Sequence, residues 1–158
     1  MKRIAQFEKV SLSQFLKNGN DEEYSNIILP KRSTKGSAGY DFFLNNDLTI
    51  SVGQTVTVPT GIRVKIDEGW VLKIYPRSSL GFKYRLTLNN TVGIIDSDYY
   101  YAENEGHIFI KMTNCGDKEI VLEKGKAFAQ GVFVEYGITY DDDCDGIRVG
   151  GFGSTDKK

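Results

Sequence analysis

The sequence predicts an all-β protein: an antiparallel, jelly-roll-like sandwich with one short N-terminal helix and a flexible C-terminal arm. Three observations predict this fold class. Apolar and polar residues alternate in short runs, as at Ile62, Val64 and Ile66. Glycine and Asn/Asp clusters separate these runs at hairpin-like intervals. Beyond the N-terminal segment, the sequence offers no amphipathic helix that could connect parallel strands.

The length and the charge limit the possible partners. A chain of 158 residues that is 40% hydrophobic can bury one core without a metal or a disulfide. We expect a β domain over residues 1–140 and the arm over 141–158. A net charge of −1 excludes the overall positive potential of non-specific nucleic-acid binders, so no nucleic acid is expected as a partner. The apolar stretches are far shorter than the ~20 residues that span a bilayer, so no membrane contact is expected.

The first residues and the cysteines indicate a reducing compartment. The basic N-terminus reaches Glu8 and Lys9 before an apolar signal-peptide core develops, so we expect a cytoplasmic protein. Cys115 and Cys144 lie far apart without metal-ligand spacing, and we expect two free thiols and no zinc site. We expect His107 only to flank the strand that begins beside it.

The N-terminal helix follows from capping and spacing. Ser11 begins a capping-box pattern, and Leu12, Phe15 and Leu16 share one helical face. Gly19 stands where a helix of this length ends.

The strands follow from a period of two. Residues 56–58, 62–66 and 108–112 place apolar side chains at alternate positions, as half-buried strands do. A final long strand is expected to start within residues 125–131. The acidic run 141–145 lacks the alternation and the distal glutamate of a calcium loop, so we interpret it as a solvated linker.

Five segments gather glycine with polar residues of defined chemistry: residues 38–42, 76–81, 90–99, 125–131 and 148–155. In the second, Arg77 and the hydroxyls of Ser78 and Ser79 follow a strand and could bind phosphate oxygens. The alternative is an ordinary turn with a surface arginine.

The remaining segments also have two interpretations each. In residues 90–99 a strand with an embedded Gly93 runs into Asp96 and Asp98, which indicates either close approach of a ligand or a simple turn. Residues 125–131 are either a functional strand start or a tight turn. The segment around Phe152 reads as a disordered tail that could also become ordered over a ligand.

In this order and spacing, the five segments resemble those of the trimeric dUTP pyrophosphatase (dUTPase) family, from about Pro30 to Thr155. The resemblance implies an enzyme that hydrolyses dUTP to dUMP and pyrophosphate with Mg²⁺ and so keeps uracil out of DNA. It also implies a jelly-roll homotrimer with shared active sites, in which the C-terminal arm of one subunit closes the site of another.

The resemblance assigns catalytic and base-binding roles. Asp96 would activate the water that attacks the α-phosphate, because a carboxylate can accept its proton. Asp41 would help to hold the phosphate and metal environment. Residues 90–99, including Asn90, Gly93 and Ile95, would form a hairpin whose backbone binds uracil. Tyr99 would lie against the sugar, in the volume that a ribose 2′-hydroxyl needs.

The resemblance also assigns the triphosphate contacts. The phosphate-side donors would be Arg77, Ser78 and Gln130. Ser79, whose hydroxyl also suits a phosphate, stands where the family more commonly has glycine. The arm would contribute Phe152, stacked on uracil, together with Arg148, Gly153, Ser154 and Thr155. Mg²⁺ would be held mainly by the triphosphate and water.

Two alternatives remain open. One is the related dCTP deaminase, which shares the fold. The other is a nucleotide-binding regulatory module that docks on a protein through Tyr100–Glu105, which we expect to be an unusually long hairpin tip.

Overall fold

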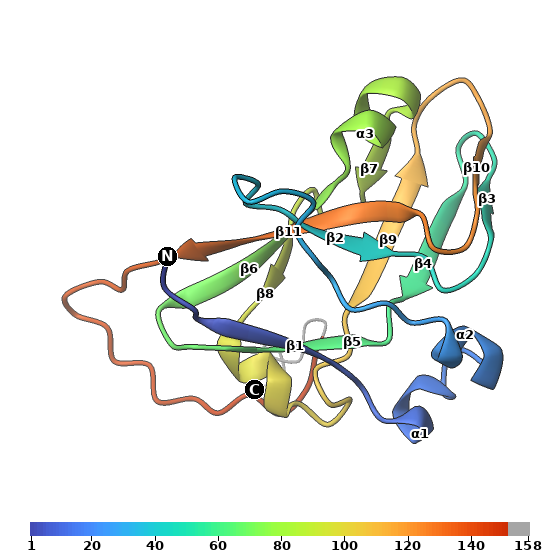
Figure 1. Ribbon diagram of the computed structural model, residues 1–158. Coiled ribbons are helices and arrows are strands. Elements are labelled where there is room, and N and C mark those ends of the chain that lie inside the picture. Colours follow the sequence, from blue (N-terminus) through green and yellow to red (C-terminus); the bar gives the residue numbers. More distant parts are fainter. Residues whose placement is uncertain (152–158) are drawn as a thin grey trace.

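Antiparallel strands make up most of the regular structure in the computed structural model, which describes residues 1–151 (Figure 1). The strands are β1 (Ala5–Lys9), β2 (Tyr40–Phe43), β3 (Leu48–Ile50), β4 (Thr55–Pro59), β5 (Ile62–Ile66), β6 (Trp70–Pro76), β7 (Leu86–Leu88), β8 (Gly93–Ile95), β9 (Phe109–Asn114), β10 (Ile120–Leu122) and β11 (Ala127–Glu135). The helices are α1 (Leu12–Phe15), α2 (Asp21–Ser25), α3 (Ser78–Tyr84) and the 3₁₀-helix η1 (Ser97–Tyr101).

Consecutive strands alternate between two main sheets. β6 and β8 belong to the four-stranded sheet β2-β11-β6-β8, whereas β7 and β9 belong to the three-stranded sheet β4-β9-β7. Two smaller pairs, β1-β5 and β10-β3, complete the arrangement. Such crossings between sheets are typical of sandwiches and jelly rolls. The predicted antiparallel β fold is confirmed.

The alternation also corrects one expectation. β8 pairs with β6, and β9 pairs with β4 and β7. The Tyr100–Glu105 segment therefore connects two sheets and is not the tip of a paired hairpin. For the same reason residues 90–99 run from one sheet into the other and do not form a hairpin with β7 or β9.

The core consists of the inward positions of the predicted alternating runs. Ile62, Val64 and Ile66 of β5 are at most 6% exposed, while the intervening Lys65 faces solvent. In and beside β9, Ile108, Ile110 and Met112 are buried in the same way. Each buried side chain of this size contributes ~1.5–3 kcal/mol through the hydrophobic effect, so the period-two pattern decides which face of each strand turns inward.

The N-terminal helix begins where the sequence predicts, but it is shorter and buries less. The Ser11 hydroxyl caps α1 by accepting a 3.2 Å hydrogen bond from the amide of Gln14. Of the predicted apolar face only Phe15 is buried, and Leu12 and Leu16 are each about 40% exposed. The capping box forms only in part, since the amide of Ser11 donates to Glu105, from a distant segment.

Several elements were not predicted. α2 begins with a complete capping box between Asn20 and Glu23, a pattern that the sequence contains. β1 has one inward aromatic, Phe7, which contacts the rings of Tyr40, Phe42 and Phe133. These three rings come from strands far away in the sequence, so the local sequence of β1 does not predict a strand.

His107 does more than flank a strand. Its side chain is fully buried, and Nε2 accepts a 2.9 Å hydrogen bond from the amide of Gly61. Nδ1, which must carry the proton, has no hydrogen-bond partner within the described residues. Burial lowers the pKa of His107 to about 4, and the nearby Glu105 carboxylate opposes this effect only in part.

We predict that His107 makes the fold acid-sensitive. Its pKa is lower in the folded protein, at about 4, than in the unfolded protein. The contribution of neutral His107 to the free energy of unfolding is therefore complete above about pH 6.5. It is lost as the pH falls towards 4, and the loss amounts to ~3 kcal/mol at most. His107→Gln keeps an acceptor for Gly61 but does not titrate. Its unfolding midpoint should therefore fall less between pH 7 and 4.5 than that of the parent chain, as measured by thermal denaturation. Parallel decreases in both proteins would contradict this prediction.

Candidate functional site

A cavity of about 320 Å³ opens between β8, η1 and β9. It is lined by Ile74, Leu88, Asn89, Asn90, Gly93, Ile94, Ile95, Asp96, Tyr99, Ile108, Phe109, Ile110, Lys111 and Arg148. Six of these residues were predicted as site residues: Asn90, Gly93, Ile95, Asp96, Tyr99 and Arg148. The walls are mainly apolar and a few polar groups converge on them, which is the usual composition of a small-molecule site.

The wall formed by β8 depends on the absence of a side chain at Gly93. Gly93 lies opposite Ile74 of β6, and a β-carbon there would lie 3.0 Å from the β-carbon of Ile74. Close packing against β6 therefore requires glycine at this position. The preceding turn is tight as well, with Thr91 at a φ of 61° and a 2.7 Å hydrogen bond from the amide of Val92 to the carbonyl of Asn90.

Two carboxylates at the edge of the cavity share one arginine. Nη2 of Arg148 donates to Asp96 at 2.6 Å, and its Nε donates to Asp98 at 2.7 Å. The carboxylates are about half exposed, whereas the arginine side chain is 19% exposed. Charge-assisted hydrogen bonds of this length hold the guanidinium in place, and its single positive charge is shared between the two carboxylates.

Tyr99 is fixed in the cavity wall by both functions of its hydroxyl. The hydroxyl donates to the carbonyl of His107 at 2.7 Å and accepts from Nδ2 of Asn104 at 2.9 Å. Burial raises the pKa of Tyr99, and this effect outweighs the hydrogen bond from Asn104 and the charge of Arg148. The residue is therefore a neutral hydroxyl that holds an aromatic ring against the cavity.

The other predicted polar residues form a second group at the end of β6. Nε of Arg77 lies 3.5 Å from Oδ1 of Asp41, whose Oδ2 accepts a 2.9 Å hydrogen bond from Ser33. Gln130 lies opposite Asp41 in the β2-β11 ladder and donates to the carbonyl of Pro76 at 3.2 Å. The group thus brings together residues from the first, second and fourth motifs.

The second motif is a strand followed by a helix. Ser78 and Ser79 are the first two residues of α3, directly after Arg77 at the helix start. The helix ends at Arg85, which has a left-handed φ of 53°. The segment therefore continues into a helix and not a simple turn, and phosphate binding by Arg77, Ser78 and Ser79 stays a prediction.

The single chain does not combine the two groups. None of Asp41, Arg77, Ser78, Ser79 and Gln130 lines the cavity that contains Asp96. Of the fifth motif, the structure describes residues 148–151. Phe152, Gly153, Ser154 and Thr155 lie outside the described residues.

The described part of the arm lies against its own chain. After β11 the chain makes a wide loop and returns to η1 (Figure 1). There the carbonyl of Val149 accepts a 3.1 Å hydrogen bond from the amide of Glu103, and Gly151 lies against the ring of Tyr99.

The cavity also contains eight lining residues that were not predicted as site residues: Ile74, Leu88, Asn89, Ile94, Ile108, Phe109, Ile110 and Lys111. Asp98, which the sequence analysis singled out beside Asp96, holds Arg148. The alternation in β9 already placed Phe109 and Lys111 on the face opposite to the buried Ile108 and Ile110. What the sequence could not supply was that residues of both faces of β9 share one cavity with residues of β8.

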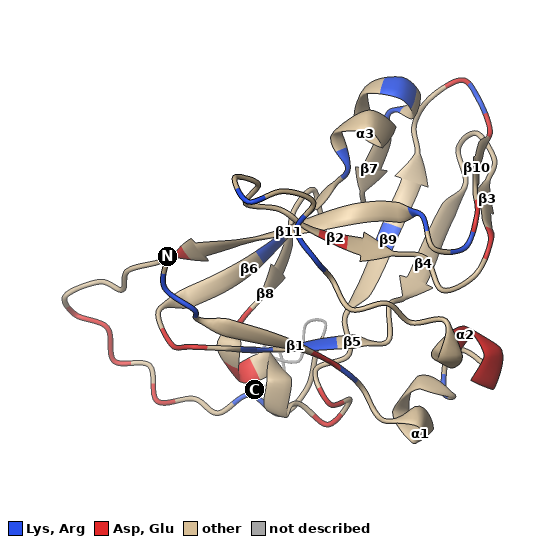
Figure 2. Ribbon diagram, in the orientation of Figure 1, with Lys and Arg blue, Asp and Glu red and all other residues tan. Residues whose placement is uncertain are grey.

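Charge and composition add few constraints. In Figure 2, acidic and basic segments alternate along the chain, with an acidic run in α2. Within residues 1–151, no three His, Cys, Asp or Glu side chains gather as a possible metal site, and no helix could cross a membrane. Cys115 and Cys144 are free, as predicted.

Comparison with known proteins identifies the family. The dUTPase family model matches residues 25–155. The chain belongs to the dUTPase family. It is 44% identical over 132 residues to the deoxyuridine 5′-triphosphate nucleotidohydrolase of Lactococcus lactis, a match that covers 82% of this chain and 88% of that protein.

Solved structures agree with this assignment. The dUTPase of Streptococcus mutans matches with a TM-score of 0.68 and 42% identity, over 84% of this chain and 97% of that chain. A Staphylococcus bacteriophage 80alpha dUTPase matches with a TM-score of 0.68 over 97% of this chain and 98% of that chain, but its 22% identity shows the fold alone. The predicted family, jelly-roll-like fold and enzyme class, a dUTP diphosphatase, are confirmed.

We predict that a side chain at Gly93 destabilises the fold of this dUTPase. Gly93→Ala should destabilise the protein by about 1–3 kcal/mol, because the added methyl group presses on Ile74. Gly81→Ala in α3 is the matched control: its methyl group meets nothing within 4 Å, so it should stabilise the protein by up to about 1 kcal/mol. Denaturant unfolding of both variants measures the difference, and equal stabilities would contradict the prediction.

Proposed function

We propose that this dUTPase hydrolyses dUTP to dUMP and pyrophosphate in the cavity between β8 and β9, by attack of an Asp96-activated water on the α-phosphate. One observation carries the proposal. β8, in the third of the five segments, lines an apolar cavity, and the carboxylate of Asp96, directly after β8, lies at the edge of that cavity. The walls can enclose a planar base, and a carboxylate placed beside the reacting phosphate can accept a proton from water.

Uracil would be recognised by the main chain of residues 90–99. Backbone groups in a tight turn are fixed in place, so a base with the opposite donor and acceptor pattern, such as cytosine, leaves buried polar groups unpaired. The ring of Tyr99 would lie against the sugar. Fixing the base and the sugar aligns the α-phosphate with the water held by Asp96.

Arg148 would exchange partners when substrate binds. Its guanidinium donates to the carboxylates of both Asp96 and Asp98. A triphosphate carries several negative charges and presents planar pairs of oxygens, so it competes for this arginine. Movement of the arm onto the site of another subunit would carry Arg148 to the phosphate bound there and would release Asp96 of its own chain to act as the base.

Magnesium would be held mainly by the substrate. Because no cluster of three potential ligands occurs among residues 1–151, the triphosphate oxygens and water would supply most of the ligands, as they often do for this ion. When bound, the ion supplies charge neutralisation and alignment of the phosphates. Asp41, already paired with Arg77, is the carboxylate of the phosphate-side group that could assist.

We further propose a homotrimer with shared active sites. The group of Asp41, Arg77 and Gln130 and the cavity of Asp96 are separate within one chain, so a second subunit is needed to bring phosphate donors to the base-binding cavity. Residues 141–158 would serve as the arm that closes a site of another subunit. The cytoplasmic location stays a prediction.

The decisive experiment is incubation with dUTP, dCTP, dTTP and UTP in the presence of Mg²⁺, followed by identification of the products. We expect dUMP and pyrophosphate from dUTP alone. Release of ammonia from dCTP would instead indicate a deaminase.

Asp96→Asn should bind dUTP with nearly unchanged affinity but turn it over at least about 100-fold more slowly, because the amide accepts no proton. Near-normal turnover would remove Asp96 from the mechanism.

A mixture of two inactive variants tests the shared site. Asp96→Asn and Arg77→Ala chains, co-refolded in equal amounts, should regain about a quarter of the parent activity, since a site with both native residues forms when each comes from a different subunit. Each variant refolded alone is the control. If both residues serve a site within one chain, the mixture will stay inactive.

A further inference from the structure

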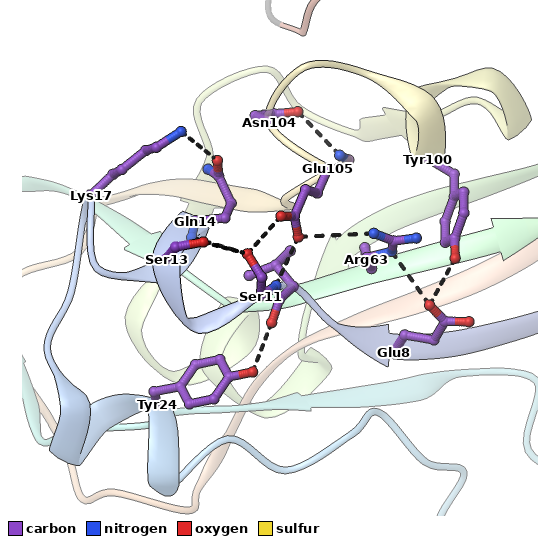
Figure 3. A network of polar contacts seen from close by, with 12 residues as sticks. Glu8, Ser11, Ser13, Gln14, Lys17, Tyr24, Arg63, Tyr100, Asn104 and Glu105 are labelled. Carbon is purple, nitrogen blue, oxygen red and sulfur yellow. Dashed lines mark hydrogen bonds and ion pairs between the residues drawn. The ribbon is translucent and has the colours of Figure 1, made fainter.

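The Tyr100–Glu105 segment is anchored to the N-terminal segment of the same chain (Figure 3). Oε1 of Glu105 accepts a 2.6 Å hydrogen bond from the hydroxyl of Ser11, and Oε2 accepts one of 2.7 Å from its amide. These bonds, aided by Arg63 and Lys17, outweigh the effect of partial burial and lower the pKa of Glu105. The carboxylate therefore stays ionised and attached to the start of α1.

A second attachment lies beside it. The guanidinium of Arg63 stacks 3.7 Å from the ring centre of Tyr100 and lies 3.4 Å from Glu8. The hydroxyl of Tyr100 donates to the same Glu8 at 2.8 Å. Tyr101, 72% exposed, is the large apolar side chain of the segment that faces solvent. Most of the segment is thus committed to contacts with its own chain, and the expected docking of another protein stays a prediction.

These attachments hold a strained turn in place. Glu105 and Gly106 have positive φ values of 59° and 71°. Left-handed backbone costs a non-glycine residue of order 1 kcal/mol or more, which the bonds of Glu105 to Ser11 offset. At Gly106 an added β-carbon would lie 2.7 Å from the carbonyl oxygen of Tyr99, so only glycine lets the turn lie this close to the backbone of that residue.

The anchored turn directs Asn104 at Tyr99. Oδ1 of Asn104 accepts a 3.2 Å hydrogen bond from the amide of Gly106, which fixes the orientation of the side-chain amide. Its Nδ2 then donates to the Tyr99 hydroxyl at 2.9 Å. Because that hydroxyl donates its only proton to the carbonyl of His107, Asn104 supplies the second of two contacts that define the position of the ring.

We propose that Asn104 is a positioning residue that sets the Tyr99 ring against the sugar and thereby determines the discrimination of dUTP from UTP. This inference rests on the proposed function. Without Asn104 the Tyr99 hydroxyl keeps one hydrogen-bond partner, the carbonyl of His107. A single hydrogen bond defines the position of the ring less closely than two do. A ring that moves excludes a ribose 2′-hydroxyl less well, while a deoxyribose remains accommodated.

The test compares kcat/KM for dUTP and for UTP in four proteins: the parent chain, Asn104→Ala, Asn104→Asp and Glu103→Ala. Asn104→Asp has the same shape, but its ionised carboxylate cannot donate. Glu103→Ala changes the same segment at an exposed carboxylate that takes part in none of the hydrogen bonds or ion pairs found in residues 1–151. Thermal unfolding of all four proteins reports stability separately.

Both Asn104 variants should lower the ratio of the two kcat/KM values by about tenfold, mainly through faster reaction of UTP, while Glu103→Ala leaves it unchanged. If the Asn104 variants unfold at a lower temperature but keep the same ratio of kcat/KM for dUTP to that for UTP, Asn104 serves only stability and the proposal is overturned. Loss of discrimination in Asn104→Ala but not in Asn104→Asp would overturn it too, because the donated hydrogen bond would not matter. If the parent chain fails to hydrolyse dUTP, the proposed function fails instead.

Discussion

The position of Ile74 between two glycines constrains the whole site. In the register of β6, Ile74 lies opposite Gly93 of β8 on one side and Gly131 of β11 on the other. A β-carbon at either glycine would press on the side chains of β6, at 3.0 Å from Ile74 or 2.8 Å from Leu72. A shift of β6 by one residue would turn Leu72 and Ile74, at most 1% exposed, out of the core, so the register has one solution.

This register determines where the functional side chains lie. Asp96 directly follows β8 at one edge of the sheet, and Arg77 directly follows β6 next to the β11 strand that carries Gln130. Each functional carboxylate has a guanidinium partner, Arg148 for Asp96 and Arg77 for Asp41. Partly exposed ion pairs contribute little to stability, so neither pair does much to hold the fold together. Under the proposed function, a phosphate could therefore exchange for either carboxylate at small cost.

Much of the fold could be predicted, because the side-chain period and the turn residues act locally. The strand around Ile62 to Ile66, the cap at Ser11 and the long strand from residue 127 follow from neighbouring residues alone. β1 could not be predicted in this way, since Phe7 makes its contacts with strands far away in the sequence. The burial of His107 is a similar case, because its partner Gly61 is remote.

The family and the identity of the polar residues could be read from the order and spacing of the five motifs, which a linear chain keeps. Asn90, Gly93, Asp96 and Tyr99 were grouped correctly, because they are close neighbours in the chain. The separation of the group around Asp41 from this cavity, and the contact of Asn104 with Tyr99, became visible only in the folded chain. These relations depend on which strands cross from one sheet to the other. Such crossings are set by the packing of the whole core, and a local pattern of residues carries no information about them.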